Sequence, residues 1–310
     1  MKTTPLGDTG ISVSELCLGT MFFGTKVDAP TSYALLDQYV EAGGSFFDTA
    51  NIYARWVGDF VGGESESLLG RWMKERGNRQ RLFVATKVGF EMPGVDRGLR
   101  ARQIEEECDK SLRRLGIDTI DLYYAHVDDR GTPLEETLKS FATLIKKGKV
   151  RVIGASNYLA WRLEEARWIS ATENMPAFSC IQQRHSYLRP VPGADFGAQV
   201  PSSRELLDFC RHRELSLLAY SPLLGGAYTR DDRPLPEAYS GEENRRRLKV
   251  LKEVAREKGA TANQLVLSWM LHSDPMALPL VAASEAAQLR ENLQAVSFEL
   301  SREDMERLGV

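Results

Sequence analysis

Short apolar runs alternate with amphipathic stretches along almost the whole chain of 310 residues. Eight of these runs predict strands, and three of them, residues 44–50, 82–87 and 119–126, are β-rich and bounded by turn or helix signals, so they predict buried strands. The eight runs cover residues 15–20, 45–50, 82–88, 119–127, 150–157, 178–184, 215–222 and 277–284. Stretches with a helical period separate them, which is typical of βα units around a parallel sheet. Eight such units predict a closed barrel.

The helical stretches complete this picture. Clear examples are residues 32–42, 64–75, 102–115, 133–147, 159–170 and 203–213. Two more, 245–258 and 261–272, both precede the eighth strand, so we expect one of them to be an extra helix. A glycine-punctuated opening, residues 6–13, predicts a β-hairpin. The expected fold is therefore a (β/α)8 TIM barrel with an N-terminal hairpin and an extra helix, in one domain over residues 1–310.

The main alternative fold is a doubly wound open sheet that binds a dinucleotide. That fold would be expected to carry GxGxxG after an early strand, and Gly62-Gly63-Glu64-Ser65-Glu66 does not supply it. Two long segments, residues 55–63 and 225–243, predict loops on the face where the strands end. Long loops at that face usually shape a substrate pocket.

Composition and charge exclude several classes of function. The 40 basic and 43 acidic residues are well mixed, and the net charge of -3 offers no field for nucleic acid or an anionic membrane. The N-terminus has no apolar signal-peptide core, and no stretch approaches the ~18 apolar residues of a membrane helix. We therefore expect a cytoplasmic protein without nucleic-acid or membrane partners. The four cysteines lie far apart without a CxxC pattern, which predicts neither a disulfide nor a metal site.

Four polar residues stand where predicted strands stop, and a barrel would bring them to one face. They are Asp48, Tyr53, Lys87 and His126. A nearby ammonium such as Lys87 favours phenolate, so we expect it to lower the pKa of Tyr53. Asp48 would balance the charge of a buried Lys87, and His126 would donate to a carbonyl oxygen. Each alone has an ordinary structural role, but together they predict a proton-transfer site, which needs a bound cofactor for redox chemistry.

Longer motifs surround these residues in a fixed order. They are Leu18-Gly19-Thr20, Phe47-Asp48-Thr49-Ala50 with Tyr53, Ser65-Glu66 with Leu69-Gly70, Ala85-Thr86-Lys87, Asp121-Leu122-Tyr123-Tyr124-Ala125-His126 and Ile153-Gly154-Ala155-Ser156-Asn157. In this order they resemble the aldo-keto reductase superfamily over nearly the whole chain. The resemblance implies a barrel that binds a nicotinamide cofactor without a Rossmann domain. It also implies hydride transfer between a carbonyl and an alcohol, with Tyr53 as general acid, Lys87 and Asp48 tuning it, and His126 orienting the carbonyl.

The resemblance further implies a set of cofactor-binding residues. Ser156, Asn157 and Gln182 would bind the nicotinamide carboxamide, and Tyr220 would stack on the nicotinamide ring. The remaining implied positions are Gly19, Thr20, Met21, Asp48, Ser221, Leu223, Ala283, Ser284, Gln288 and the adenine contacts Glu291 and Asn292.

Two positions depart from the pattern of the superfamily. Many members hold the 2′-phosphate of NADPH with basic residues after the eighth strand, whereas residues 281–288 contain no Lys or Arg. We therefore expect NADP(H), with NAD(H) as the alternative and only a modest preference between them. The second departure is His185, because relatives more often place an aromatic residue there.

The resemblance leaves other functions open. Members that serve as potassium-channel β subunits keep the barrel and the nucleotide but act as regulatory partners, and the barrel's start almost at Met1, without an appended docking segment, argues against that role. A metal-dependent sugar isomerase would need several carboxylates or histidines at strand ends, where only Asp48 and His126 are placed. We expect a small aldehyde, ketone or sugar as substrate. Charged or aromatic loop residues hint at a polar, hydroxylated ligand; they are Arg55, Trp56, Asp128, Asp129 and Arg184.

Overall fold

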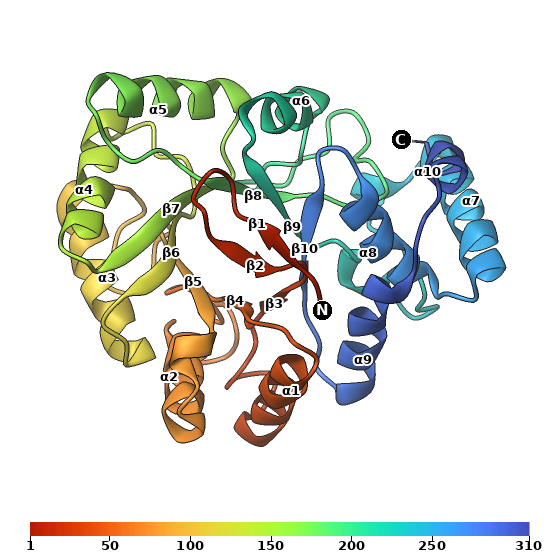
Figure 1. The fold of residues 1–310 in the computed structure, drawn as a ribbon, viewed down its shortest axis with the longest axis horizontal. Helices are drawn as coiled ribbons and strands as arrows, with labels where there is room; N and C mark the ends of the chain where they lie inside the picture. The colour runs from red at the N-terminus through yellow and green to blue at the C-terminus, as the bar shows by residue number, and fades with distance from the viewer. Residues whose placement is uncertain (310) are drawn as a thin grey trace.

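The computed structural model describes residues 1–309, and residue 310, the last of the predicted domain, lies outside them. Eight parallel strands close into a barrel surrounded by helices (Figure 1). The strands are β3 Cys17–Gly19, β4 Phe46–Asp48, β5 Phe83–Val88, β6 Ile120–Ala125, β7 Val150–Ser156, β8 Cys180–Arg184, β9 Ser216–Tyr220 and β10 Ala277–Val281. They pair in chain order, and β10 closes the barrel against β3. The predicted (β/α)8 barrel is confirmed.

The predicted N-terminal hairpin is also confirmed, and it covers the end of the barrel where the strands begin. It consists of β1 Thr3–Pro5 and β2 Ser12–Ser14, which pair antiparallel and cross the barrel in Figure 1. The Gly7 amide donates to the hydroxyl of Ser216, the first residue of β9, over 2.7 Å. A Cβ at Gly7 would lie 2.5 Å from the carbonyl oxygen of Ser179, so a side chain does not fit there. The hairpin leaves the opposite end of the barrel for a site.

Helices cover the outside of the barrel. They are α1 Ala29–Glu41, α2 Glu64–Arg76, α3 Ala101–Leu115, α4 Leu134–Lys146, α5 Ala160–Thr172, α6 Arg204–Arg213, α7 Glu242–Lys258, α8 Ala262–His272, α9 Ala286–Gln294 and α10 Arg302–Arg307. Helix α8 packs on β10, whereas α7 packs on α8. Helix α7 is therefore the expected extra helix, and Figure 1 shows it outside the ring of helices beside α10.

Element boundaries differ from the sequence prediction where polar residues follow an apolar run. Strands β3 and β4 have three residues each, because the strand pairing covers only part of the predicted runs, residues 15–20 and 45–50. Helix α7 begins at Glu242, three residues before its predicted start. Glu242 and Glu243 stand in its first turn, where negative charge is favoured by the helix dipole. The loop before α7 is correspondingly shorter and includes one-turn 3-10 helices at Leu224–Gly226 and Glu237–Tyr239.

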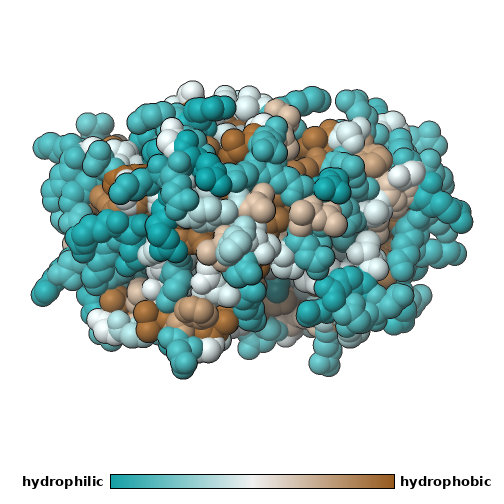
Figure 2. All heavy atoms as spheres, turned by 90° about the horizontal axis from the view of Figure 1, so that it is seen from below, coloured by the Kyte–Doolittle hydropathy of each residue, from teal (hydrophilic) through white to brown (hydrophobic). Residues whose placement is uncertain are grey.

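The core has two parts, one inside the barrel and one between the barrel and its helices. Inward-facing Phe46, Leu122 and Leu218 form the first part, and Leu6 and Val13 of the hairpin close it from below. Both faces of the strands are thus buried, which explains why the strands appear as continuous apolar runs. Hydrophilic side chains cover most of the face shown in Figure 2, with hydrophobic ones in scattered patches. Within residues 1–309 no helix is long and apolar enough to cross a membrane.

Candidate active site at the end of the strands

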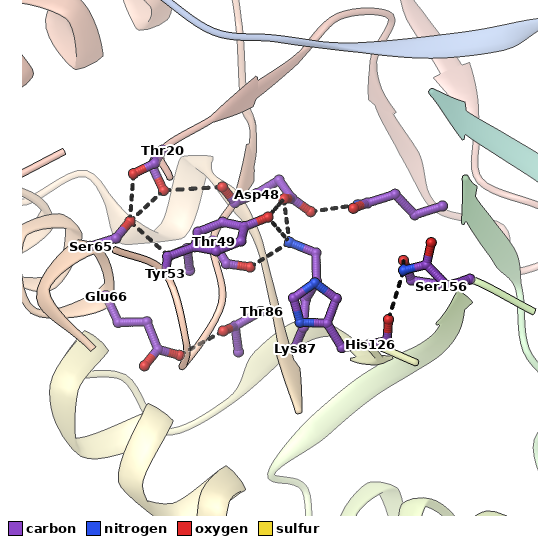
Figure 3. Close-up of polar contacts among 12 residues, drawn as sticks. Thr20, Asp48, Thr49, Tyr53, Ser65, Glu66, Thr86, Lys87, His126 and Ser156 are labelled. Atoms are coloured by element: carbon purple, nitrogen blue, oxygen red, sulfur yellow. Dashed lines mark hydrogen bonds and ion pairs between the residues drawn. The ribbon is translucent and has the colours of Figure 1, made fainter. Parts of the chain in front are cut away.

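Lys87, on β5, is the centre of the candidate site. Its side chain is fully buried, and its ammonium forms an ion pair with Asp48, the last residue of β4. The same ammonium donates to the carbonyl oxygen of Thr49 over 2.8 Å and to the hydroxyl of Tyr53 over 2.5 Å (Figure 3). All three N–H groups of Lys87 therefore have an acceptor, as a buried ammonium requires.

The carboxylate of Asp48 is equally well held. One oxygen accepts from Lys87 and from the hydroxyl of Tyr53, the latter over 3.1 Å. The other accepts from the amide of Gln182, on β8, over 2.7 Å. We expected Gln182 to serve the nicotinamide carboxamide, whereas in this structure its amide nitrogen donates across the barrel to Asp48. The site is thus fixed from both sides.

The protonation of Tyr53 differs from the sequence expectation. Burial, and after it the negative charge of Asp48, raise the pKa of Tyr53 well above 10. Burial also lowers the pKa of Lys87, which Asp48 opposes. We expected Lys87 to lower the pKa of Tyr53, but the net shift is upward, because burial and then the neighbouring carboxylate dominate. Tyr53 is accordingly a neutral phenol with a proton to give.

His126 directly follows β6 and lies beside the cluster of Asp48, Tyr53 and Lys87. Its backbone amide donates to the carbonyl of Val88 over 2.8 Å. Its ring meets Tyr53 and Phe90 edge to face, with centroids 6.1 Å and 4.8 Å away. Burial, with Lys87 nearby, holds the pKa of His126 well below 6.5, so the imidazole is neutral. Its Nδ1 atom is buried and has no hydrogen-bond partner within residues 1–309.

A layer of hydrogen bonds behind the site holds the strand ends in place. The hydroxyl of Ser65, at the start of α2, contacts the hydroxyls of Thr20 and Thr49 over 2.8 and 2.9 Å (Figure 3). The next residue, Glu66, accepts from Thr86 over 2.6 Å and is itself completely buried. The sequence marked Ser65 and Glu66 only as part of a motif. A hydroxyl residue followed by an acidic residue at the start of a predicted helix could have indicated that Ser65 and Glu66 anchor the strand ends.

Asn157 joins three elements on the other side of the pocket. Its backbone has φ of 61°, a left-handed conformation that asparagine tolerates better than most residues. Its amide nitrogen donates to the carbonyl of His126 and to the hydroxyl of Ser156, over 3.0 and 3.1 Å. Its amide oxygen accepts from the hydroxyl of Tyr220, at the end of β9, over 2.8 Å. Ser156, Asn157 and Tyr220 are thus brought together beside His126.

The other predicted cofactor residues lie at strand ends or at and within helix α9. Around the N-terminus of α9, the amide and hydroxyl of Ser284 both donate to Gln288, over 3.0 and 3.1 Å. Glu291 accepts from Thr261 over 2.6 Å, and Asn292 donates to a backbone carbonyl over 3.2 Å. The remaining members lie at the end of β3 or after β3, β9 and β10; they are Gly19, Thr20, Met21, Ser221, Leu223 and Ala283. No hydrogen bond within residues 1–309 joins the Ser284 group to Asp48, Tyr53 and Lys87.

Comparison with known proteins supports a family assignment. The model of the aldo/keto reductase family matches residues 15–309. The uncharacterized oxidoreductase YrpG of Bacillus subtilis is 32% identical over 100% of this chain and 95% of its own. Norsolorinic acid reductase stcV of Emericella nidulans is 33% identical over 96% of this chain and 77% of its own. A probable voltage-gated potassium channel subunit beta of Arabidopsis thaliana is 29% identical over 96% of this chain and 91% of its own.

The fold agrees with these sequence relations. The crystal structure of a thermostable aldo-keto reductase, in complex with the inhibitor epalrestat, superimposes with a TM-score of 0.78. That protein is 29% identical, and the match covers 99% of this chain and 98% of the other. The motifs at the strand ends therefore stand on the fold that the resemblance implied. The chain belongs to the aldo/keto reductase family of oxidoreductases.

Proposed function

We propose that this protein, acting as a single domain, interconverts the carbonyl group of a small aldehyde, ketone or sugar and the corresponding alcohol with NAD(P)H. Tyr53 serves as general acid in the direction of reduction. The observation that carries the proposal is the buried contact of Lys87 with both Tyr53 and Asp48. A neutral phenol whose oxygen accepts from an ammonium can transfer its proton to a carbonyl oxygen, because the ammonium stabilises the phenolate that remains.

The surrounding side chains set the direction of this transfer. Tyr53 donates to Asp48 over 3.1 Å, and its O–H turns from that carboxylate to the carbonyl oxygen of the substrate. Asp48 stays in place because Lys87 and Gln182 hold its two oxygens. The neutral imidazole of His126 offers its single N–H to the same carbonyl oxygen. Two donors converging on one oxygen both orient the carbonyl and stabilise the charge that develops on it.

The residues at the mouth of the barrel fit a nicotinamide cofactor, which supplies the hydride when bound. Ser156, Asn157 and Gln182 would hold the carboxamide, and Tyr220 would form the wall against the ring. Backbone amides at the N-terminus of α9 suit phosphate or ribose oxygens, because Glu285 at the cap position makes no side-chain hydrogen bond to them. NADP(H) is the proposed cofactor because the family typically uses it. NAD(H) is the alternative, since Ser284 and Gln288 are neutral.

An absorbance assay at the nicotinamide band tests the proposal. Purified protein is mixed with NADPH or NADH and a panel of aliphatic and aromatic aldehydes, ketones and sugars. We expect substrate-dependent oxidation of the cofactor for at least one carbonyl class. Normal nucleotide binding without turnover of any carbonyl, or of any alcohol in the reverse assay, would contradict the proposal. That result would favour the alternative of a regulatory nucleotide-binding subunit; the Arabidopsis relative is named a probable voltage-gated potassium channel subunit beta.

A further inference from the structure

Arg184 is the last residue of β8 and faces the mouth of the barrel. Cys180, on the same strand, packs inside the barrel, and Gln182 reaches Asp48. Side chains alternate along a strand, so Arg184 lies on the same side, one step beyond Gln182. Two residues of strand span roughly 7 Å, which places Arg184 directly above the level at which Gln182 holds the catalytic carboxylate.

Within residues 1–309 the guanidinium of Arg184 has no polar partner. Its Nε and Nη1 atoms are buried and make no hydrogen bond within residues 1–309. Its carbon lies 4.6 Å from the ring centroid of Phe196, a contact that orients the group but satisfies no N–H. Buried donors without an acceptor are costly, and those of a cation especially so. The residue as a whole is partly exposed.

Two other arginines at this end of the barrel have partners from the chain. Arg162 pairs with Asp128 over 3.1 Å and with Glu165 over 2.7 Å. Arg55 pairs with Glu91 over 3.3 Å. No carboxylate within residues 1–309 lies within ion-pair distance of Arg184. The positive charge of Arg184 also acts on Tyr239: burial raises the pKa of Tyr239, and Arg184 opposes that rise.

Arg184 also stands next to the proposed nicotinamide wall. It pairs in register with Tyr220 of β9, and the carbonyl of Tyr220 accepts from the amide of His185 over 3.3 Å. The two side chains therefore project from neighbouring strands toward the same opening. A group bound against Tyr220 lies within reach of a side chain as long as arginine.

We propose that Arg184 binds an oxyanion of the ligand, which is either the diphosphate of the dinucleotide or a carboxylate or phosphate on the carbonyl substrate. The inference rests on the proposed function, because it assumes that the ligand enters this mouth. A guanidinium is the side chain best suited to such groups, since its charge is permanent and its N–H donors lie in one plane. Arg184 would thus select anionic ligands without taking part in proton transfer.

Two variants and a control test this role. Arg184→Met retains a stem that packs on Phe196 but removes the charge, and Arg184→Lys keeps the charge without the planar donors. Arg189→Met is the control, because this exposed arginine lies on the loop that follows β8 and pairs with Glu243 over 3.3 Å. Dissociation constants for NADPH and NADH are measured by quenching of tryptophan fluorescence. Turnover is compared for succinic semialdehyde and for butanal, which differ in the carboxylate.

The outcomes separate the two sources of the anion. If the diphosphate is bound, Arg184→Met raises both nucleotide dissociation constants at least ~10-fold, Arg184→Lys less, and Arg189→Met leaves them unchanged. If the substrate supplies the anion, the nucleotide constants stay constant and the kcat/KM ratio of succinic semialdehyde to butanal falls at least ~10-fold. Nucleotide constants and substrate ratio both within about twofold of the unmodified protein would overturn the proposal.

The two proposals fail in distinguishable ways. Should the protein reduce neither aldehyde, the proposed function fails, and the Arg184 proposal is decided by binding alone. In that case two affinities are measured, that for the nucleotide and that of the NADP-bound protein for succinate. Succinate carries the same carboxylate on an unreactive molecule. Weaker binding of nucleotide or succinate by Arg184→Met supports the proposal, and equal binding of both refutes it.

Discussion

The two sides of the barrel mouth differ in how far the chain satisfies its own polar groups. On the side of β4 and β5, Lys87 has three acceptors and both oxygens of Asp48 have donors. On the side of β8 and β10, Arg184 has no polar partner in the part of the chain that the structure describes, and Ser284 bonds to its neighbour Gln288. The Lys87–Asp48 pair is complete without a ligand, whereas Arg184 leaves donors that a ligand can satisfy.

For the proposed reaction, this difference assigns proton transfer to the first side and ligand binding to the second. Proton transfer requires groups that are fixed before the substrate arrives, since reorientation during the reaction would raise the barrier. Ligand binding gains instead from donors whose acceptors come with the ligand, because their desolvation has already taken place in the folded protein. Substitutions on the first side should therefore change turnover and stability, and those on the second side should change affinity.

The largest expected effect is the loss of the transferable proton. Tyr53→Phe retains the ring and should lower the rate of reduction at least ~100-fold, as expected for removal of a general acid. Nucleotide affinity should change little, because the hydroxyl contacts only Asp48 and Lys87 within residues 1–309. Single-turnover absorbance measurements isolate the chemical step. Near-normal single-turnover rates would remove Tyr53 from its role and erase the contrast between the two sides.

Lys87→Met tests whether the catalytic side also stabilises the fold. It leaves the buried carboxylate of Asp48 without its cation, and we expect a loss of about 3–5 kcal/mol in the free energy of unfolding. Turnover should fall as strongly as in Tyr53→Phe, because the phenolate loses its support. Urea denaturation measures the change in stability.

The double variant Lys87→Met with Asp48→Asn is the control for this prediction. It removes both charges, so most of the stability should return while turnover stays low. If Lys87→Met lost less than about 1 kcal/mol, the carboxylate would have to be protonated or hydrated, contrary to the closed arrangement of the site.

The barrel and the residues at its strand ends could be predicted from the sequence because they depend on local patterns. An apolar run that stops at Lys87 or His126 places that residue at the mouth as soon as the strands are parallel. The partner of Gln182 could not be predicted, because it depends on a side chain reaching across the barrel to Asp48. The unsatisfied state of Arg184 depends on the loop that brings Phe196 over it.

The net upward shift of the Tyr53 pKa could not be predicted from the sequence for a similar reason. The sequence shows that an ammonium is near but not how much water remains around the phenol. In the structure burial is the largest influence and Asp48 the next. Competition between desolvation and charge depends on depth, which only the packed structure provides.

The cofactor preference is a smaller effect on the binding side. Ser284 and Gln288 are neutral, and Arg230 of the loop before α7 is paired with Asp232 over 2.9 Å. Discrimination for NADPH over NADH should therefore be about 1.4–3 kcal/mol, or roughly 10- to 150-fold. Fluorescence titration with both nucleotides gives the ratio, and Gln288→Arg should increase it by restoring a cation. A ratio several orders of magnitude larger in the unmodified protein would reveal a phosphate-binding group on the binding side.

The smallest expected effect is a pH dependence of stability that has a histidine on each side. His185 stacks on Trp269 with centroids 5.7 Å apart, and burial lowers its pKa from 6.5 to about 4. Burial and Lys87 lower the pKa of His126 in the same direction. Between pH 6.5 and about 4 the unfolded chain therefore binds protons that folded His185 refuses, so stability is complete above pH 6.5 and falls as the pH drops.

His185→Phe isolates the contribution of His185, on the binding side, to the pH dependence of the unfolding free energy. Phenylalanine keeps an aromatic ring on Trp269 but cannot titrate, so the slope of unfolding free energy between pH 6 and 5 should decrease by up to about 1.4 kcal/mol per pH unit. Urea denaturation at several pH values measures both slopes. Between pH 7.5 and 8.5, where both histidines are neutral, the two proteins should have the same slope. Equal slopes between pH 6 and 5 would show that His185 takes up its proton in the folded state. The remaining slope of the variant would then have to come from His126 and the carboxylates, and the loss of stability in acid would belong to the catalytic side.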